Sequence, residues 1–413
     1  MEVNKMSFVL TKNNCLIFTL IVLNLSIFRN VSMIGYLLVL LICYLLDFVF
    51  LVRERRYNKY NIFILSIFLF FNVLIFINSF EWLSSKELFI ASGRAYLLLP
   101  FIVICSCYRF NYDLIIKLLK TQAIIIAIGC FTIPLQMLIG PISFFADISF
   151  RAEGIRYASL LGSATTIGTN GAYGLIIFLF LKDKFKYKGI YYLNSFFIVF
   201  AMLMSLQKAA AVNLILVFIL YFLFKSRNIV RTLLNILLCC ILLLAFIIIL
   251  YFLDNEYTNV ILKSLGIKTL SDVGYIGPPV LEDLITRITY LPKRVYLAHN
   301  FGYLEFFKGV GLSAFSGIVG IERFPMAHNN YIDYLASGGV FYLLFIVALF
   351  IDICVYTYKI RKLDELYVAY MSLVVLLLIN MFIGAGSLIP PINAIFYIII
   401  FSYRNKMFYK EIN

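Results

Sequence analysis

Apolar residues fill this chain in long runs that short polar segments separate. A helix of about 20 apolar residues crosses the hydrocarbon core of a bilayer. The pattern therefore predicts twelve membrane helices, near residues 14–29, 33–52, 60–80, 88–108, 119–139, 160–181, 190–206, 209–224, 232–253, 337–357, 366–386 and 391–403. One polar segment is much longer than the others and runs from Asp254 to Ala336. We expect an all-α polytopic membrane protein, with one membrane domain over residues 1–413 and residues 254–336 inserted as a large loop between the ninth and tenth spans.

Composition agrees with this architecture and limits the chemistry. The chain is 63% hydrophobic and 17% aromatic, whereas soluble proteins are about 45–50% apolar. The apolar run after Lys12 continues to Phe28 without a small-residue cleavage site, so we expect a membrane helix there and no cleavable signal. All eight cysteines lie in apolar runs. Neither a disulfide scaffold nor a zinc site is therefore expected.

The positive charge of the chain indicates its orientation. Most of the 35 Lys and Arg residues lie in the segments on the same side as the two termini. Lys and Arg gather in the cytoplasmic loops of membrane proteins, so both termini are predicted to be cytoplasmic and the large loop extracytoplasmic. The net charge of +14 is then the signature of membrane topology, and no nucleic-acid partner is expected.

The large loop contains both histidines of the chain. His328 stands just before an apolar helix, which Asn329 or Asn330 can cap if it begins at about Tyr331. The positive end of that helix favours a neutral imidazole, which can accept a proton, and its free N–H groups suit a phosphate oxygen. The alternative is an ordinary polar loop tip. His299 lies in a predicted amphipathic helix, where we expect it to be packed and hydrogen-bonded.

Four arginines in the predicted outer loops are candidates for binding an anion, because a guanidinium matches a phosphate with paired hydrogen bonds. Arg151 and Arg156 lie in the segment 140–159, and Arg287 and Arg294 lie in the large loop. Arg287 and Arg294 are seven residues apart and share a face if their helix continues through Pro292, where we expect a kink or break. Taken singly, each arginine is better explained by pairing with a nearby acid than by contact with a ligand.

Two further cations lie at or within predicted spans. Lys208 stands in a tight turn between two apolar runs, so its ammonium is predicted to reach the outer compartment. Arg94 lies inside a span, where a charge in lipid is unfavourable, and it should face a protein interior or a water-filled cavity. For both residues the alternative is a side chain that extends to the membrane surface.

Several motifs are absent from the sequence. It contains no Gly-rich phosphate loop of the nucleotide-binding kind, no outer Asp-x-Asp pair and no His, Cys and carboxylate cluster with metal spacing. We therefore expect no cofactor, and chemistry that depends on neither a nucleotide nor a metal.

The order of the polar motifs resembles the O-antigen ligase and polymerase superfamily. These are membrane glycosyltransferases that act on undecaprenyl-diphosphate-linked glycans. The resemblance covers roughly 190 residues, in the order Arg151-Ala-Glu-Gly154, Ser205 to Lys208, Arg287, Gly309-Val-Gly311 and His328-Asn329-x-Tyr331-x-x-x-Leu335-x-x-x-Gly339. The family turn usually reads Ser-Arg-Gly, whereas this chain has Gln207-Lys208-Ala209.

The resemblance implies roles for these residues and a location for the protein. His328 corresponds to the essential histidine and Arg287 to the arginine that binds the diphosphate. The residues expected to complete the substrate site are Lys208, Arg151, Arg156, Arg294, Asn329 and Arg94. The implied protein has a GT-C-like fold, lies in the inner (cytoplasmic) membrane and works without metal. Its implied partners are undecaprenyl-diphosphate-linked glycans, membrane lipids and a polysaccharide chain-length regulator.

The resemblance leaves several functions open. The favoured hypothesis is a polymerase of O-antigen or capsule repeat units. A ligase that transfers finished glycan to the lipid A core shares the same sequence features. A flippase for the lipid-linked units is a second alternative, although transporters usually place more polar groups at the bilayer midplane. A non-catalytic assembly protein is a third.

Overall fold

The computed structural model describes most of the chain. The described residues are 11–52, 58–142, 145, 149–151, 154–225, 289–321, 323–384 and 386–404, together with isolated positions between 234 and 286. Most of the predicted span near 232–253 and most of the first half of the large loop lie outside the described residues.

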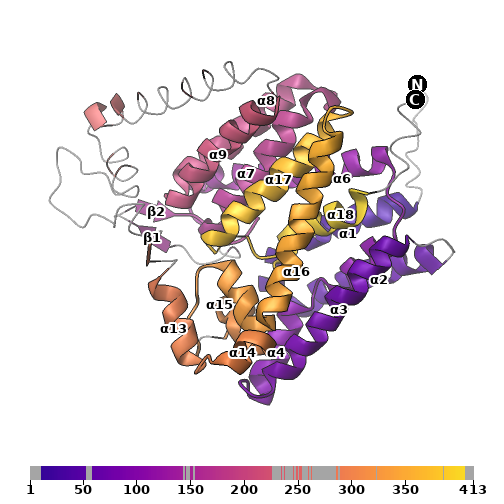
Figure 1. Ribbon diagram of the computed structural model, residues 1–413. Coiled ribbons are helices and arrows are strands. Elements are labelled where there is room, and N and C mark those ends of the chain that lie inside the picture. The colour runs from indigo at the N-terminus through magenta and orange to yellow at the C-terminus, as the bar shows by residue number, and fades with distance from the viewer. Residues whose placement is uncertain are drawn as a thin grey trace.

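The described chain is almost entirely helical (Figure 1). Its first half contains α1 (Lys12–Asn24), α2 (Met33–Val52), α3 (Lys59–Ser79), α4 (Ser85–Ala95), α5 (Leu99–Cys107), α6 (Tyr112–Ile139), α7 (Ala164–Phe180), α8 (Lys188–Met204) and α9 (Lys208–Lys225). Its second half contains α13 (Tyr290–Ala298), α14 (Tyr303–Lys308), α15 (Ser316–Val319), α16 (Asn330–Ile360), α17 (Glu365–Phe382) and α18 (Ala394–Ser402). Short 3₁₀ segments are η1 (Ser26–Asn30), η2 (Lys182–Lys184), η3 (Gly311–Phe315) and η4 (Pro391–Asn393). The strands β1 (Ser149–Arg151) and β2 (Gly154–Arg156) form an antiparallel hairpin.

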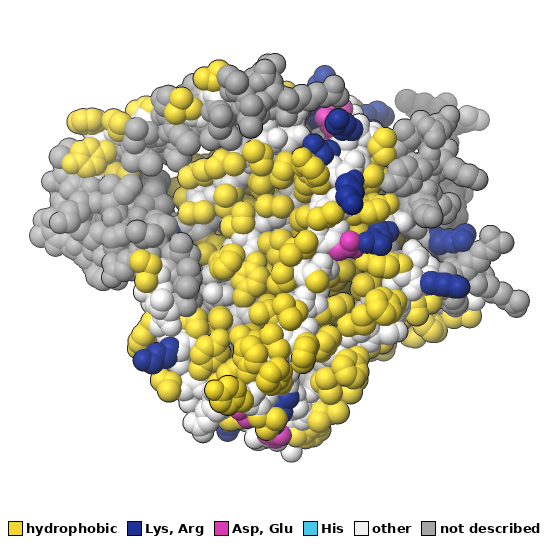
Figure 2. Space-filling view, viewed as in Figure 1, with side chains coloured by type: hydrophobic (Ala, Val, Ile, Leu, Met, Phe, Trp, Pro, Cys, Tyr) yellow, Lys and Arg dark blue, Asp and Glu magenta, His cyan; other side chains and the backbone are white. Residues whose placement is uncertain are grey.

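Seven helical segments of the described chain are long and apolar enough to cross a membrane. They are Met33–Val52, Lys59–Ser79, Ser85–Cys107, Tyr112–Ile139, Lys208–Lys225, Asn330–Ile360 and Glu365–Phe382. Three shorter apolar helices, Thr166–Phe180, Lys188–Met204 and Pro391–Ser402, correspond to further predicted spans. Hydrophobic side chains cover the middle of the visible surface, and charged side chains gather toward its two ends (Figure 2). The all-α, multi-span class is confirmed, and the count of twelve spans stays a prediction.

Hydrogen bonds between helix ends show which ends lie together. Tyr108 at the end of α5 donates to Asn13 in α1 at 3.1 Å, and Tyr112 at the start of α6 donates to Asp364 before α17 at 2.9 Å. We call this end of the bundle the termini face. The opposite end, which carries the β-hairpin, α13 to α15 and the start of α16, is the loop face (Figure 1). Which face is cytoplasmic stays a prediction.

The predicted helix 88–108 is interrupted. It ends as α4 at Ala95 and resumes as α5 at Leu99, with a turn over residues 96–98. Pro100 causes the break, because a proline has no N–H to donate to the carbonyl four residues earlier and its ring clashes there. The hydroxyl of Tyr96, in the turn, donates to the backbone oxygen of Asn72 on α3 at 3.0 Å. The break therefore opens space between α3 and the rest of the bundle.

Helix α16 begins seven residues before the predicted span 337–357 and breaks inside it. Gly339 has φ 76° and ψ 178°, and a Cβ there would overlap the carbonyl oxygen of Phe307. A Cβ on Gly309 would likewise overlap the carbonyl oxygen of Ser337, and the amide of Val310 donates to Ala336 at 2.6 Å. The Gly309-Val-Gly311 motif therefore lets a loop segment cross α16 at its break, which is a structural role.

Candidate functional site

His328 lies immediately before α16, on the loop face. Asn329 is the N-cap of this helix, and its side-chain oxygen accepts hydrogen bonds from the amides of Tyr331 at 3.1 Å and Ile332 at 3.5 Å. The capping prediction is thus confirmed at Asn329, with the helix starting at Asn330. Ala327 and Asn329 are buried, whereas His328 between them is exposed. The imidazole is therefore the one side chain of this tripeptide that faces outward.

The backbone of His328 adopts a left-handed conformation, with φ 49°. Such a φ is uncommon for a residue other than glycine and often marks a functional site. Gly384, just after α17, packs directly on it: a Cβ on Gly384 would lie 2.5 to 2.7 Å from the His328 backbone. The amide of Gly386 also donates to the side chain of Asn330 at 2.8 Å. The segment after α17 therefore fixes the start of α16 and the conformation of His328.

A hydrogen bond from Arg156 joins the β-hairpin to the turn that precedes Lys208. The Nε of Arg156 donates to the carbonyl of Ser205 at 3.0 Å, three residues before Lys208. Lys208 is the first residue of α9 and is only 5% exposed, so the prediction that its ammonium reaches the outer compartment is wrong. Leu206, in the same turn, shares the left-handed backbone of His328, with φ 51°. The structure thus joins the segment 140–159 to the turn between α8 and α9, as a shared cationic site requires.

Helix packing relates these cations to His328. The side chain of Gln207 donates to the carbonyl of Ala164 at 2.7 Å, which ties the α8–α9 turn to the start of α7. Helix α17 packs against both α7 and α9. Because α17 ends two residues before Gly384, His328 contacts the segment that follows a helix packed against both α7 and α9.

Arg94 and Arg294 lie elsewhere on the loop face. Arg94 is exposed in the last turn of α4, and its guanidinium lies over Gly320, where any Cβ would overlap it. Arg294 is exposed on α13. Neither is joined to His328, Arg156 or Lys208 by a hydrogen bond within the described residues, so the structure does not bring all the predicted cations together.

Arg287 and the side chain of Arg151 are the two remaining parts of the predicted site. Arg287 lies outside the described residues. The backbone of Arg151 pairs with Gly154 in the hairpin, and its side chain lies outside the description.

His299 is packed as predicted, although its helix differs from the prediction. The ring is buried, with Nδ1 2.9 Å from the carbonyl of Val295 and Nε2 3.1 Å from the hydroxyl of Ser313. It stacks on Phe324 at 4.5 Å, and burial lowers the pKa of its imidazole. The predicted helix over residues 280–307 is shorter in the structure: α13 begins at Tyr290 and ends at Ala298, before His299. Pro292 falls in its first turn, where no intrahelical donor is needed.

No group of three His, Cys, Asp or Glu side chains lies in the described part of the chain in an arrangement that could hold a metal ion.

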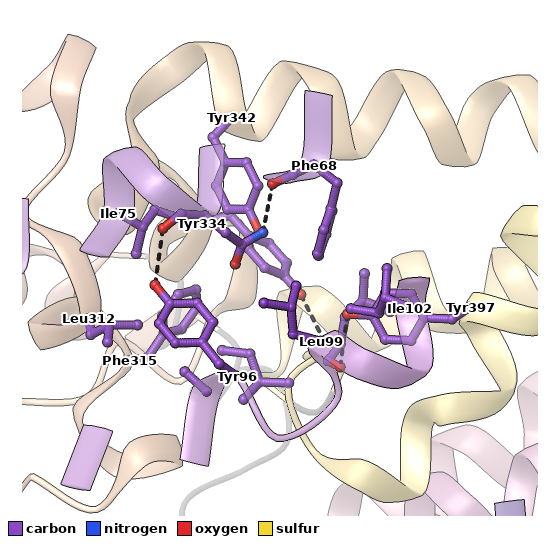
Figure 3. A pocket seen from close by; sticks show the side chains of 14 residues that line it. Phe68, Ile75, Tyr96, Leu99, Ile102, Leu312, Phe315, Tyr334, Tyr342 and Tyr397 are labelled. Atoms are coloured by element: carbon purple, nitrogen blue, oxygen red, sulfur yellow. Dashed lines mark hydrogen bonds between the residues drawn. The ribbon is translucent and has the colours of Figure 1, made fainter. Parts of the chain in front are cut away.

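Sequence reasoning missed two features of this region. Asp333, in the first turn of α16, is buried and accepts a hydrogen bond from Asn330 at 2.9 Å; its signal was an acid in a first turn. The second feature is an aromatic pocket beside η3, lined by four tyrosines from three separate segments (Figure 3). Their wide spacing in sequence gave no signal.

Comparisons of this chain with known protein families, with curated proteins and with solved structures find no match. Its function is therefore argued from the site.

Proposed function

We propose that this protein polymerises oligosaccharide repeat units carried on undecaprenyl diphosphate, as an O-antigen or capsule repeat-unit polymerase. The observation that carries the proposal is the placement of His328. It is exposed, is held in a left-handed backbone conformation, and contacts the segment after α17, a helix that packs against α9, of which Lys208 is the first residue. Base-assisted glycosyl transfer from a diphosphate requires a fixed, accessible imidazole and cations at the same end of the bundle.

In the proposed reaction, His328 removes the proton of an acceptor sugar hydroxyl. The hydroxyl oxygen forms a bond to the anomeric carbon of the donor sugar as the bond from that carbon to the diphosphate breaks. The electron pair leaves with the diphosphate, and cations stabilise the growing negative charge. Help from a general base is typically worth about 10²–10⁴ in rate. The energy lies in the donor linkage itself, so no nucleotide is needed.

The cations have different proposed tasks. Arg287 binds the diphosphate in the proposal, as the family resemblance implies. Lys208 supplies a point charge in place of the family arginine, without its planar fork. Arg156 holds the α8–α9 turn through Ser205 and so positions Lys208. Asn329 caps α16 with its oxygen and thereby fixes His328; because the cap occupies two amides, the helix end offers fewer N–H groups to a phosphate.

The test is substitution of the two central residues, read as glycan length on a gel. We expect His328→Ala and Arg287→Ala to be present in the membrane at normal levels but to yield no long chains. Lys293→Ala, at an exposed position of α13, is the matched control and should give a normal ladder. Normal ladders from both test variants would contradict the assignment.

A second substitution separates chemistry from backbone geometry. Asparagine tolerates left-handed φ better than most residues but cannot act as a base near neutral pH. His328→Asn should therefore fold normally and still make no long chains. Full activity in this variant would show that the position serves the backbone alone.

Deletion of the gene distinguishes the polymerase from its alternatives. A polymerase defect leaves single repeat units on the final glycan acceptor. Long lipid-linked chains that are not transferred would indicate a ligase, and repeat units accumulating on the cytoplasmic side would indicate a flippase.

A further inference from the structure

The short helix α14 exposes its apolar side chains and turns its charged ones toward the protein. Its four large apolar side chains are exposed by 39 to 92%, and they are Tyr303, Leu304, Phe306 and Phe307. Its two charged side chains, Glu305 and Lys308, are only partly exposed. A surface helix of a soluble domain does the reverse and presents its charges to water. The exposed side of α14 therefore fits an apolar medium.

Hydrogen bonds hold α14 in this orientation. The carboxylate of Glu305 accepts from the amide of Gly302 at 2.9 Å. The ammonium of Lys308 donates to both carboxylate oxygens of Glu81, at 2.8 and 2.6 Å. The side chain of Asn78, near the end of α3, donates to the carbonyl of Lys308 at 2.6 Å. The polar groups of α14 are thus bound to the protein, and its apolar side chains point away from it.

The lengths of the neighbouring spans give the depth of α14. On α16, the ring of Phe341 lies beside that of Phe307, with centroids 6.1 Å apart. From Phe341 to Lys359, in the last turn of α16, is on the order of 27 Å at about 1.5 Å per residue. Helix α3 has 21 residues, which span on the order of 31 Å. The hydrocarbon core of a bilayer is about 30 Å thick, so both spans place α14 at its loop-face boundary.

The exposed side of α14 continues the membrane-facing surface of the bundle. Phe341 on α16 and Phe80, directly after α3, are both exposed beside it. Figure 2 shows hydrophobic side chains from the middle of the bundle to the end at which Figure 1 places α14. Tyrosine is enriched where acyl chains meet headgroups. We propose that α14 lies in the bilayer at this level and that phospholipid covers its exposed side.

Helix α13 provides a contrast on the same face. Its first residue, Tyr290, is exposed, and so are Lys293 and Arg294. Residues three and four apart share one side of a helix, so this tyrosine stands beside an ammonium and a guanidinium. Charged groups are unfavourable in hydrocarbon. The exposed side of α13 therefore belongs in water, and lipid contact is specific to α14.

Contact between α14 and lipid changes the expected role of the large loop. Residues 254–336 are a polar insert outside the membrane by sequence, whereas residues 303–308 within it would touch the bilayer. An anchored α14 holds the loop face at the level of the headgroups, where the diphosphate of a lipid-linked donor lies. This consequence rests on the proposed function, whereas lipid contact itself is independent of it.

Fluorescence quenching in phosphatidylcholine vesicles tests the contact on the full chain. The chain has one tryptophan, so Trp82→Phe gives a background without this fluorophore. Added to it, Tyr303→Trp reports on α14, and Tyr290→Trp is the matched control on α13. Lipid brominated on the upper acyl carbons should remove about half or more of the Tyr303→Trp emission, because that level adjoins the headgroups. It should leave most of the Tyr290→Trp emission, and aqueous iodide should quench the two variants in the opposite order. Equal quenching of both variants by the lipid would overturn the proposal.

Photochemical crosslinking gives a second measurement that retains Trp82. Benzoylphenylalanine replaces Tyr303, the isolated membranes are irradiated, and the mass of the product identifies the neighbour. An adduct with phospholipid supports the proposal. A crosslinked dimer of the chain, or an adduct with another protein in place of lipid, overturns it. The same group in place of Tyr290 should give no lipid adduct, and equal lipid adducts at both positions would contradict the contrast with α13.

The two proposals fail in different ways. His328→Ala should leave the lipid quenching of Tyr303→Trp unchanged while it makes no long chains, because α14 is fixed by Glu81 and Asn78 and not by His328. If His328→Ala polymerises normally and Tyr303→Trp is quenched by lipid, the membrane contact stands and the proposed function fails. The opposite pair of results removes the contact and keeps the function.

Discussion

One group of charged side chains on each face of the protein can be compared. On the termini face, Arg404 donates to both oxygens of Asp352 at 2.6 and 2.7 Å. Tyr60 donates to the same carboxylate at 3.0 Å and Tyr403 also donates to it, while the guanidinium lies 4.4 Å from the Tyr60 ring centroid. We call this group the clasp. It joins the start of α3, the middle of α16 and the end of α18.

On the loop face, two of the predicted cations stay exposed. Arg94 and Arg294 make no hydrogen bond or ion pair within the described chain, and His328 projects outward between two buried neighbours. A charge that is hydrogen-bonded between helices stabilises the fold, whereas exposed cations are available to an anionic ligand. The comparison therefore assigns stability to the clasp and ligand binding to the loop face, and each assignment can be tested separately.

The largest expected effect is on activity, at Gly384. Alanine there would be strained at φ 71° and would push against the His328 backbone, 2.5 Å away. A displacement of about 1 Å in a catalytic group can lower the rate about 10²-fold. Gly384→Ala should therefore reduce chain elongation by about that factor, with protein still present in the membrane. Gly93→Ala is the control, because nothing lies within 4 Å of a Cβ at that position. Equal elongation rates in both variants would show that Gly384 does not position His328.

The second effect is on stability, at the clasp. Asp352→Asn removes the charge that Arg404 and two tyrosines share. Hydrogen bonds to a charged group contribute about 1.5–3 kcal/mol, and partial exposure reduces that value, so we expect a loss of about 2 kcal/mol. Thermal unfolding in detergent measures it. The glycan ladder should keep its normal length distribution, and its loss in a well-folded Asp352→Asn protein would break the comparison.

The third effect is a pH dependence that comes from His299. Burial, with Arg323 nearby, lowers the pKa of this imidazole from its ordinary value of 6.5. Above pH 6.5 the ring is neutral in both the folded and the unfolded chain, so stability is unaffected. As the pH falls below 6.5, the unfolded chain binds a proton that the folded chain does not, and the free energy of unfolding decreases.

Unfolding measured between pH 5 and 8 checks this dependence. His299→Gln keeps a polar side chain that does not titrate, so its stability should vary less across the same range. An unchanged slope in the variant would place the pH dependence elsewhere in the chain.

The sequence predicted the parts of the fold that follow from local pattern. The apolar runs located the helices, the Asn329 cap followed from a known preference, and His299 was expected to pack. Breaks within helices were harder to predict. The turn before Leu99 depends on a proline. The non-helical backbone at Gly339 depends on the crossing of a segment about 30 residues away in sequence. Long-range contacts of this kind leave no periodic signal.

The candidate site shows the same division. His328 and the cations could be proposed as site residues from residue type alone, because acid–base chemistry and anion binding depend on side-chain identity. Their grouping was not predictable, since the Arg156–Ser205 bond and the Gly384–His328 contact join segments about 50 residues apart. The pocket tyrosines lie on α16, α18 and the α4–α5 break, so only the folded bundle brings them together.

The smallest expected effect is at an ion pair of the loop face. Lys308 lies 2.6 Å from Glu81, and the glutamate side chain is 54% exposed. Exposed pairs contribute about 0–1 kcal/mol, because water and salt screen them. Glu81→Gln should therefore change the unfolding temperature far less than Asp352→Asn, and the small change should vanish in high salt. The distinction between the faces depends on this contrast: if Glu81→Gln destabilises the protein as much as Asp352→Asn, the loop face also carries stability in its charges, and exposure there would no longer indicate a ligand site.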